Sequence, residues 1–202
     1  MFFVIEGIDG AGCETQAKAV YNSLIREFVN KKCYLIKYPD YSKNVGKFIK
    51  EFLYENKNLT AGEQFLLYSL QFLMDKQWIA KKRKKEIILA DRYFSTTLCF
   101  QTLEGVSLNK ALRFADDFEI EKPDVIFYLD VDPNIAINRK FGEQKEKNRR
   151  EKDFDFIRKT YRQYEMLVDK QIWAQWIRID GNKGIEEITK DIYNLLISKI
   201  KY

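Results

Sequence analysis

The N-terminal segment constrains the fold most strongly, because an apolar stretch runs directly into a glycine-rich turn. The stretch is Phe2 to Glu6 and the turn is Gly7 to Gly12, whose first and last residues have the spacing of a phosphate-binding loop. Glycine adopts positive φ without strain, so backbone N–H groups can converge on phosphate oxygens in front of a helix N-terminus. The segment therefore predicts a strand, a phosphate loop and a helix, in that order.

The residues after the loop supply the helix that this motif requires. Apolar side chains recur there at helical spacing: Ala17, Val20, Tyr21, Leu24 and Phe28. An ordinary tight turn between a strand and a helix is the alternative, and the complete context favours a site for phosphate.

Two chemically active positions of the loop carry unusual residues. Cys13 stands where a phosphate loop has lysine, and Glu14 stands where it has a hydroxyl that binds Mg²⁺. The cation that touches the β and γ phosphates is therefore missing, although a carboxylate can itself bind Mg²⁺. Cys13 is either a small residue that fits or a thiol made reactive by the helix N-terminus.

Five apolar segments alternate with helical patterns along the chain, which predicts an α/β fold with a five-stranded parallel sheet and helices on both faces. A ligand site is expected at the carboxyl ends of the strands. The candidate strands are Phe2–Glu6, Cys33–Lys37, Glu86–Ala90, Val125–Asp130 and Trp176–Ile179.

Polar chemistry follows several of these strands. Asp91 can hold a metal-bound water at a strand end, and Arg92 beside it offers a planar fork for phosphate. A structural ion pair is the alternative for these two neighbours. The polar loop that begins at Phe141 carries Lys145, Lys147, Arg149 and Arg150. These cations are either solvated surface or a lid that closes over transferring phosphates.

Composition fits one domain, 1–202, with a lid at about 141–152. The chain has 202 residues, 46% of them hydrophobic, and a net charge of +5 that suits anionic ligands. This charge does not choose between nucleotides and nucleic acid, and the phosphate loop leads us to expect small nucleotides as partners and no nucleic acid. We also expect no membrane and a cytoplasmic location, since no apolar run has spanning length and the start lacks a signal-peptide pattern. The basic run Lys81 to Lys85 is interpreted as the solvated end of a helix. Three cysteines and no histidine suggest neither disulfides nor zinc.

Several motifs together resemble the thymidylate kinase family, in its order and spacing from the first strand to the last helix. They are Phe2 to Gly12, Tyr38-Pro39-Asp40-Tyr41 with Gly46, Asp91-Arg92-Tyr93 with Ser95, Thr96, Thr97 and Gln101, Tyr128 to Pro133, and the helix with Phe154, Phe156 and Tyr164. The resemblance implies the P-loop nucleoside monophosphate kinase fold, ATP as co-substrate, Mg²⁺, a homodimer and phosphoryl transfer to dTMP in dTTP biosynthesis.

The resemblance also implies roles for single residues. The dTMP side would comprise Asp9 at the sugar hydroxyl, Arg92 at the acceptor phosphate, Tyr68 stacked on thymine, Thr97 and Gln101 at the base edge, Phe100 near the deoxyribose, and Pro39, Tyr41 and Thr96. The ATP side would comprise Gly7, Ile8, Asp9, Gly10, Ala11, Gly12, Cys13, Glu14, Thr15 and, near adenine, Arg139. Asp9, Arg92, Arg149 and Arg150 would be catalytic. Glu14 and Asp91 are candidate metal ligands because they are carboxylates, and not because of the resemblance. Tyr68 and Phe100 could instead be core aromatics.

Three departures from the family pattern leave the function open at this point. Besides Cys13 and Glu14, the pair Gln71-Phe72 stands where the family has a pair such as Asp-Arg, which removes an arginine near the acceptor phosphate. The chain is then an active dTMP kinase in which lid cations replace the missing charge, a catalytically impaired nucleotide-binding homologue, or a kinase for another pyrimidine monophosphate.

Overall fold

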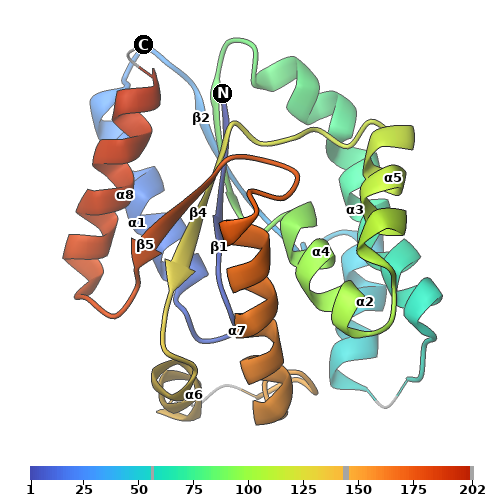
Figure 1. Ribbon diagram of the computed structural model, residues 1–202. Helices are drawn as coiled ribbons and strands as arrows, with labels where there is room; N and C mark the ends of the chain where they lie inside the picture. Colours follow the sequence, from blue (N-terminus) through green and yellow to red (C-terminus); the bar gives the residue numbers. More distant parts are fainter. Residues whose placement is uncertain (56, 143–145, 201–202) are drawn as a thin grey trace.

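Five short strands form one parallel sheet in the order β2-β3-β1-β4-β5 (Figure 1). The computed structural model describes residues 1–55, 57–142 and 146–200. The parallel five-stranded sheet predicted from the sequence is confirmed, with β3 shifted by one residue and β5 extended by one. The strands are β1 (Phe2–Glu6), β2 (Cys33–Lys37), β3 (Ile87–Asp91), β4 (Val125–Asp130) and β5 (Trp176–Asp180).

The central strands are apolar up to their last residues, such as Glu6 and Asp91, because both faces of the sheet are covered. All five residues of β1 and all five of β3 are buried. The register places Ile5 beside Asp91 and beside Phe127, so the three central strands end at one common edge. Lys37, the last residue of β2, is also paired with Asp91.

Helices cover both faces of the sheet, as Figure 1 shows. Helices α1 and α8 pack together on one face, and α3, α4 and α7 lie on the other. None of the helices in the described part of the chain is long and apolar enough to cross a membrane. The helices are α1 (Cys13–Glu27), α2 (Asn44–Tyr54), α3 (Ala61–Lys82), α4 (Phe94–Leu103), α5 (Leu108–Asp117), α6 (Pro133–Gly142), α7 (Phe154–Asp169) and α8 (Ile185–Ile200).

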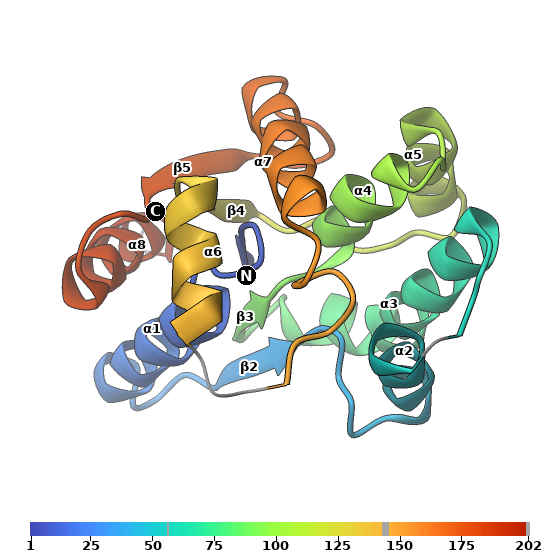
Figure 2. The same cartoon turned by 90° about the horizontal axis from the view of Figure 1, so that it is seen from below.

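Helix α6 lies beyond the carboxyl ends of the strands, at the bottom of Figure 1 and toward the viewer in Figure 2, and it borders the phosphate loop. Gly10 has a φ of 90°, and a Cβ at this position would come within 2.2 Å of the carbonyl oxygen of Ala136. Only glycine therefore allows α6 to pack this close to the loop.

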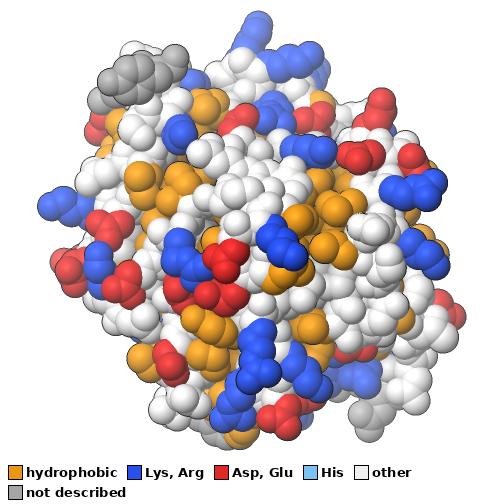
Figure 3. Space-filling model, viewed as in Figure 1, with side chains coloured by type: hydrophobic (Ala, Val, Ile, Leu, Met, Phe, Trp, Pro, Cys, Tyr) orange, Lys and Arg blue, Asp and Glu red, His pale blue; other side chains and the backbone are white. Residues whose placement is uncertain are grey.

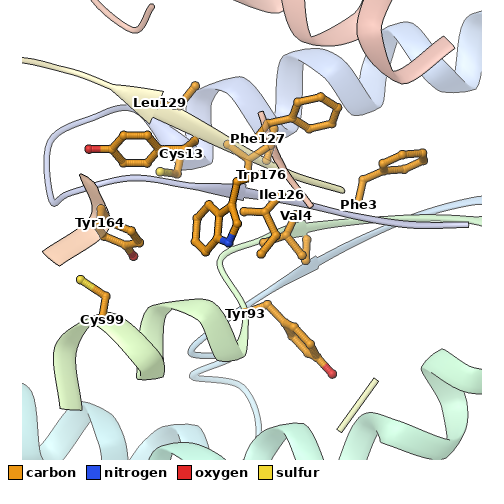
Figure 4. Packing of buried hydrophobic residues seen from close by; sticks show 14 of the residues in the cluster. Phe3, Val4, Cys13, Tyr93, Cys99, Ile126, Phe127, Leu129, Tyr164 and Trp176 are labelled. Carbon is orange, nitrogen blue, oxygen red and sulfur yellow. The ribbon is translucent and has the colours of Figure 1, made fainter. Parts of the chain in front are cut away.

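An aromatic cluster joins α3 to the sheet. The ring of Phe72 lies 4.9 Å from that of Tyr38, 5.0 Å from Tyr93 and 5.7 Å from Phe94 between centroids. Phe72 is only 2% exposed, so this residue fills the core where the family resemblance would place an arginine. Figure 4 shows Tyr93 among the other buried residues of this core. The arginine that the family resemblance implies at this position is therefore absent, and no side chain of α3 replaces it at position 72.

The basic run Lys81 to Lys85 lies at the end of α3, as predicted. The helix ends at Lys82, and Arg83 caps its last turn. Arg83 also donates to Glu121 and to Asp124, at 2.9 and 2.6 Å. Part of the run thus stabilises the surrounding structure.

Candidate active site

A cavity of about 710 Å³ opens at the carboxyl ends of the strands. It extends from the loop before α8, past the phosphate loop, to α3 and α4. The carboxyl ends of the strands point to the bottom of Figures 1 and 3, and several Lys and Arg side chains lie there on the face shown in Figure 3. The residues expected in the site that line the cavity are Ile8, Asp9, Gly10, Ala11, Gly12, Cys13, Glu14, Thr15, Pro39, Tyr41, Tyr68, Asp91, Arg92, Thr96, Thr97, Phe100, Gln101, Arg139 and Arg150. Gly7 and Arg149 lie outside this lining.

The phosphate loop has the backbone of an anion site. Gly12 has a φ of 95° and leads directly into α1, and the N–H of Ala11 closes the turn on the carbonyl of Ile8 at 3.0 Å. The first turn of a helix leaves its N–H groups without intrahelical partners, here those of Cys13, Glu14 and Thr15. These donors and the positive end of the helix dipole favour phosphate.

Cys13 contributes no charge to this loop. The residue is 5% exposed, and burial raises the pKa of its thiol. Figure 4 shows it within the buried core, and its sulfur lies near Gly7. The suggestion of a reactive thiol is therefore wrong: low-dielectric surroundings outweigh the helix N-terminus and keep the thiol neutral.

Glu14 is bound by two lysines in this structure. Its oxygens accept from Lys18 Nζ at 2.7 Å and from Lys37 Nζ at 2.6 Å. These two hydrogen bonds lower the pKa of the Glu14 carboxyl to about 2. Lys18 lies one turn further along α1, whereas Lys37 reaches the carboxylate from the end of β2. Lys37 has no local signal in the sequence, because its pair with Glu14 forms only when β2 ends beside α1.

Asp91 lies deeper at the same edge. Its side chain is 5% exposed, with Lys37 Nζ at 3.8 Å from Oδ2. Burial raises the pKa of the Asp91 carboxyl to about 6, against the opposing effects of Arg92 and Lys37. Asp91 and Glu14 therefore share one ammonium group between them.

These two carboxylates fit the needs of Mg²⁺. In proteins Mg²⁺ binds one or two carboxylates together with water and substrate phosphates. The described residues contain no group of three or more His, Cys, Asp or Glu side chains that could hold a metal alone. Glu14 and Asp91 would accordingly be partial ligands, completed by the phosphates of a nucleotide.

Arg92 is fixed at the centre of the cavity. Its Nη1 donates to the carbonyl of Gly7 at 2.9 Å, and its Nη2 donates to Asp9 Oδ1 at 2.8 Å. The backbone of Arg92 has a φ of 65°, in the left-handed region. The guanidinium is thus aimed at the phosphate loop from the neighbouring strand, with Asp9 as its counter-charge.

The Glu6 carboxylate, at the end of β1, holds the residues that follow Arg92 in place through hydrogen bonds. Glu6 is fully buried and accepts from the backbone N–H of Tyr93 at 3.1 Å. It also accepts from the hydroxyl groups of Ser95 at 2.6 Å, Thr96 at 2.8 Å and Tyr164 at 2.8 Å. In the sequence Glu6 is only the last residue of a strand, so its partners on α4 and α7 give no local signal.

Aromatic and amide side chains form the end of the cavity at α3 and α4. Tyr68 and Phe100 line it, and the guanidinium carbon of Arg92 lies 5.8 Å from the centroid of the Phe100 ring. Thr97 and Gln101 are 1% and 3% exposed. Within the described residues, Gln101 Oε1 is buried without a hydrogen-bond partner. A buried acceptor of this kind points to a donor on a ligand.

The segment after α6 contributes one arginine to the cavity. Arg150 donates to Glu104 and, at 3.0 Å, to Gln64, and it lies 4.3 Å from the centroid of the Phe156 ring. Arg149 instead donates to the carbonyl of Lys57 at 3.0 Å and covers the ring of Phe52. Lys145, which was counted with these cations, lies outside the described residues.

Arg139 marks the opposite end of the cavity. Both of its terminal nitrogens donate to the carbonyl of Gly181 at 3.2 Å. Lys183 and Gly184, which precede α8, and Ile185, its first residue, also line the cavity. This end is therefore separated from Tyr68 and Gln101 by the phosphate loop.

Comparisons with known proteins agree with this geometry. The family model described as "Thymidylate kinase" matches residues 5–192. Over the whole chain, 28% of residues are identical to the thymidylate kinase of Leptospira interrogans, with 96% of that protein covered. The probable thymidylate kinase of Sulfurisphaera tokodaii is 30% identical, with 99% of this chain and 97% of that protein covered. A solved thymidylate kinase structure from Candida albicans has a TM-score of 0.76 at 21% identity, covering 98% of this chain and 91% of that one.

The raised pKa of Asp91 predicts a pH-dependent stability. A folded-state pKa of about 6 exceeds the unfolded value, so the folded state holds the proton more tightly and loses stability as pH rises from about 4 to 6. Asp91→Asn does not titrate there. In chelator-treated protein, the free energy of unfolding of Asp91→Asn minus that of the wild type should increase by up to about 3 kcal/mol from pH 4 to pH 7.5. Urea titrations at both pH values measure this gain, and an equal difference at both would contradict it.

Proposed function

The chain belongs to the thymidylate kinase family, and we propose that its cavity binds ATP along the phosphate loop and dTMP at the α3–α4 end. The activity is transfer of the γ-phosphoryl group of ATP to dTMP, which gives dTDP and ADP. Such an enzyme is a phosphotransferase of nucleotide biosynthesis.

The observation that carries the acceptor assignment is the unpaired oxygen of Gln101. Thymine presents an N–H between two carbonyl groups, and buried Gln101 Oε1 can accept from it. The hydroxyl of Thr97 is available on the same helix, and Tyr68 faces the cavity as a stacking surface. A base site with a placed acceptor rejects analogues that lack the donor. Among the described residues, no observation favours an impaired homologue or another pyrimidine monophosphate.

Arg92 and Asp9 are proposed to organise the acceptor phosphate. The Arg92 guanidinium has a planar fork that suits phosphate, and its bonds to Gly7 and Asp9 hold it beside the loop. Asp9 lies within reach of the acceptor sugar in this proposal. With Phe72 in the core, Arg92 carries more of the charge on this side.

The donor side is proposed to follow the phosphate loop toward Arg139. The N–H groups of the loop and first helical turn bind the phosphates, and Arg139 lies at the end suited to adenine. Glu14 and Asp91 are the proposed partial ligands of Mg²⁺, which supplies charge neutralisation at the β and γ phosphates when bound.

The segment 141–152 is proposed to act as a lid of a single domain that spans 1–202. Arg150 already lines the cavity, so it supplies positive charge near the transferring group. Arg149 contributes only when it leaves the ring of Phe52. In the described part of this segment, the backbone N–H of Arg149 donates to the carbonyl of Leu53 on α2 at 3.1 Å.

A homodimer is proposed from an apolar stripe on α3. Its members follow each other every four residues and are exposed: Leu66, Leu70, Met74 and Trp78. A contiguous stripe of large apolar side chains on a long helix suits the self-complementary contact of a two-fold dimer. The proposed location is the cytoplasm, where the three free cysteines stay reduced.

Turnover should depend on dTMP and on Arg92. Purified protein with ATP and Mg²⁺ should form ADP rapidly only when dTMP is added, and Arg92→Ala should reduce kcat/KM by at least about a hundredfold, because the acceptor phosphate loses its main cation. Arg113→Ala, on an exposed residue of α5, is the matched control and should retain activity. Absence of dTMP-dependent ADP in the wild type would refute the proposed function.

Leu70→Glu should separate the proposed dimer. A buried, unpaired carboxylate at the centre of the stripe is costly, so the mass in sedimentation should fall to that of one chain. Ile25→Glu is the control, because Ile25 on α1 has the same 44% exposure but lies outside the stripe. A wild-type protein that already sediments as a monomer at micromolar concentration would contradict the homodimer.

A further inference from the structure

The neutral Cys13 leaves the phosphate loop without its usual cation. Phosphoryl transfer relies on placed positive charge at the bridging and terminal phosphate oxygens. Glu14 makes this requirement stricter, because its carboxylate adds a negative charge at the start of α1. A cation from another segment must therefore reach the mouth of the loop.

Lys37 is the cation that the fold brings to this place. It is the last residue of β2, in register with Asp91 on β3, so its side chain leaves the sheet at the carboxyl edge. Its Nζ lies 2.6 Å from Glu14 Oε2 and 3.8 Å from Asp91 Oδ2, and the residue lines the cavity. The ammonium group thus stands between the two carboxylates that flank the expected phosphate and metal positions.

We propose that Lys37 binds the β and γ phosphates of ATP in place of the missing phosphate-loop lysine, and that Glu14 holds its ammonium group beside the loop until the nucleotide binds. The inference rests on the proposed function and identifies a further catalytic residue of that site. Compared with the usual phosphate loop, position 13 lacks a cation and position 14 adds an anion. Lys37, at the end of β2, supplies a positive charge and forms an ion pair with Glu14.

The chemistry of the side chain suits this exchange. Lysine is a compact point charge on a flexible four-carbon stem, so its ammonium can move from a carboxylate to a nearby phosphate. The Lys37 side chain is 46% exposed, which leaves room for that movement. The Glu14 side chain is also 46% exposed, so solvent screens its charge after Lys37 moves.

Lys18 provides a matched comparison within the same cluster. It binds the other oxygen of Glu14 at nearly the same distance, but its side chain is 62% exposed. Its ion pair with Glu14 joins residues four apart on one helix, whereas Lys37 also approaches Asp91 from a neighbouring strand. If only the total charge of this cluster matters, replacing Lys18 or Lys37 with methionine should have the same effect. If Lys37 contacts phosphate, only its replacement should impair ATP binding and turnover.

The test compares Lys37→Met with Lys18→Met in full-length protein. Lys37→Met should lower kcat about a hundredfold and weaken binding of ATP and ADP about tenfold, while AMP binding changes less than twofold. Lys18→Met should change each quantity less than about threefold. Lys37→Arg should retain more activity than Lys37→Met, and Cys13→Lys added to Lys37→Met should recover at least tenfold in kcat.

Two results would overturn the inference. The first is an equal effect of the two methionine variants. The second is unchanged ATP and ADP binding in Lys37→Met, and a rise in the KM for dTMP in that variant would then assign Lys37 to the acceptor. If the wild type lacks dTMP-dependent turnover, the proposed function fails, and the ATP and ADP affinities relative to AMP still decide the role of Lys37. Melting temperatures of each variant separate these effects from misfolding.

Discussion

The geometry of the phosphate site depends on the hydrogen bonds that the fully buried Glu6 carboxylate accepts. A charge without solvent is costly unless several donors meet it, and here one backbone N–H and three hydroxyl groups do so. The donors come from the start of α4 and from Tyr164 on α7, so one side chain joins β1, the β3–α4 junction and α7. Arg92 lies next to this junction with its left-handed backbone, which fixes its guanidinium between Gly7 and Asp9.

Around this fixed centre, the positive charge of the site has moved between segments while the backbone cradle has stayed in place. The glycines and first-turn N–H groups of the loop provide the same anion site whatever side chain stands at position 13. Transferring phosphates respond to where charge is placed and aligned, so a lysine on a neighbouring strand can serve them. In the sequence, Cys13 and Glu14 suggest a phosphate loop that cannot support catalysis. Both residues are compatible with a kinase whose cation comes from β2.

The sequence predicted the sheet well because buried parallel strands are continuous apolar runs. It predicted the phosphate loop because Gly7 and Gly12 have the characteristic spacing of that motif. It predicted most of the residues that line the cavity through the family resemblance. It did not identify Glu6 or Lys37, because their partners lie far along the chain and become neighbours only through strand register and helix packing. The sequence leaves open whether Cys13 is a small residue that fits or a reactive thiol, and only its burial beside Gly7 decides for the first.

The most direct test is a crystal structure of the protein with ADP, Mg²⁺, a fluoroaluminate in place of the transferring phosphoryl group, and dTMP. The account predicts Lys37 Nζ within hydrogen-bonding distance, about 3 Å, of a β-phosphate or fluoroaluminate ligand atom, with Glu14 released from it. It also predicts Arg92 on the acceptor phosphate. Lys37 still bound to Glu14 and Asp91, with an arginine of the lid on the β phosphate instead, would contradict it.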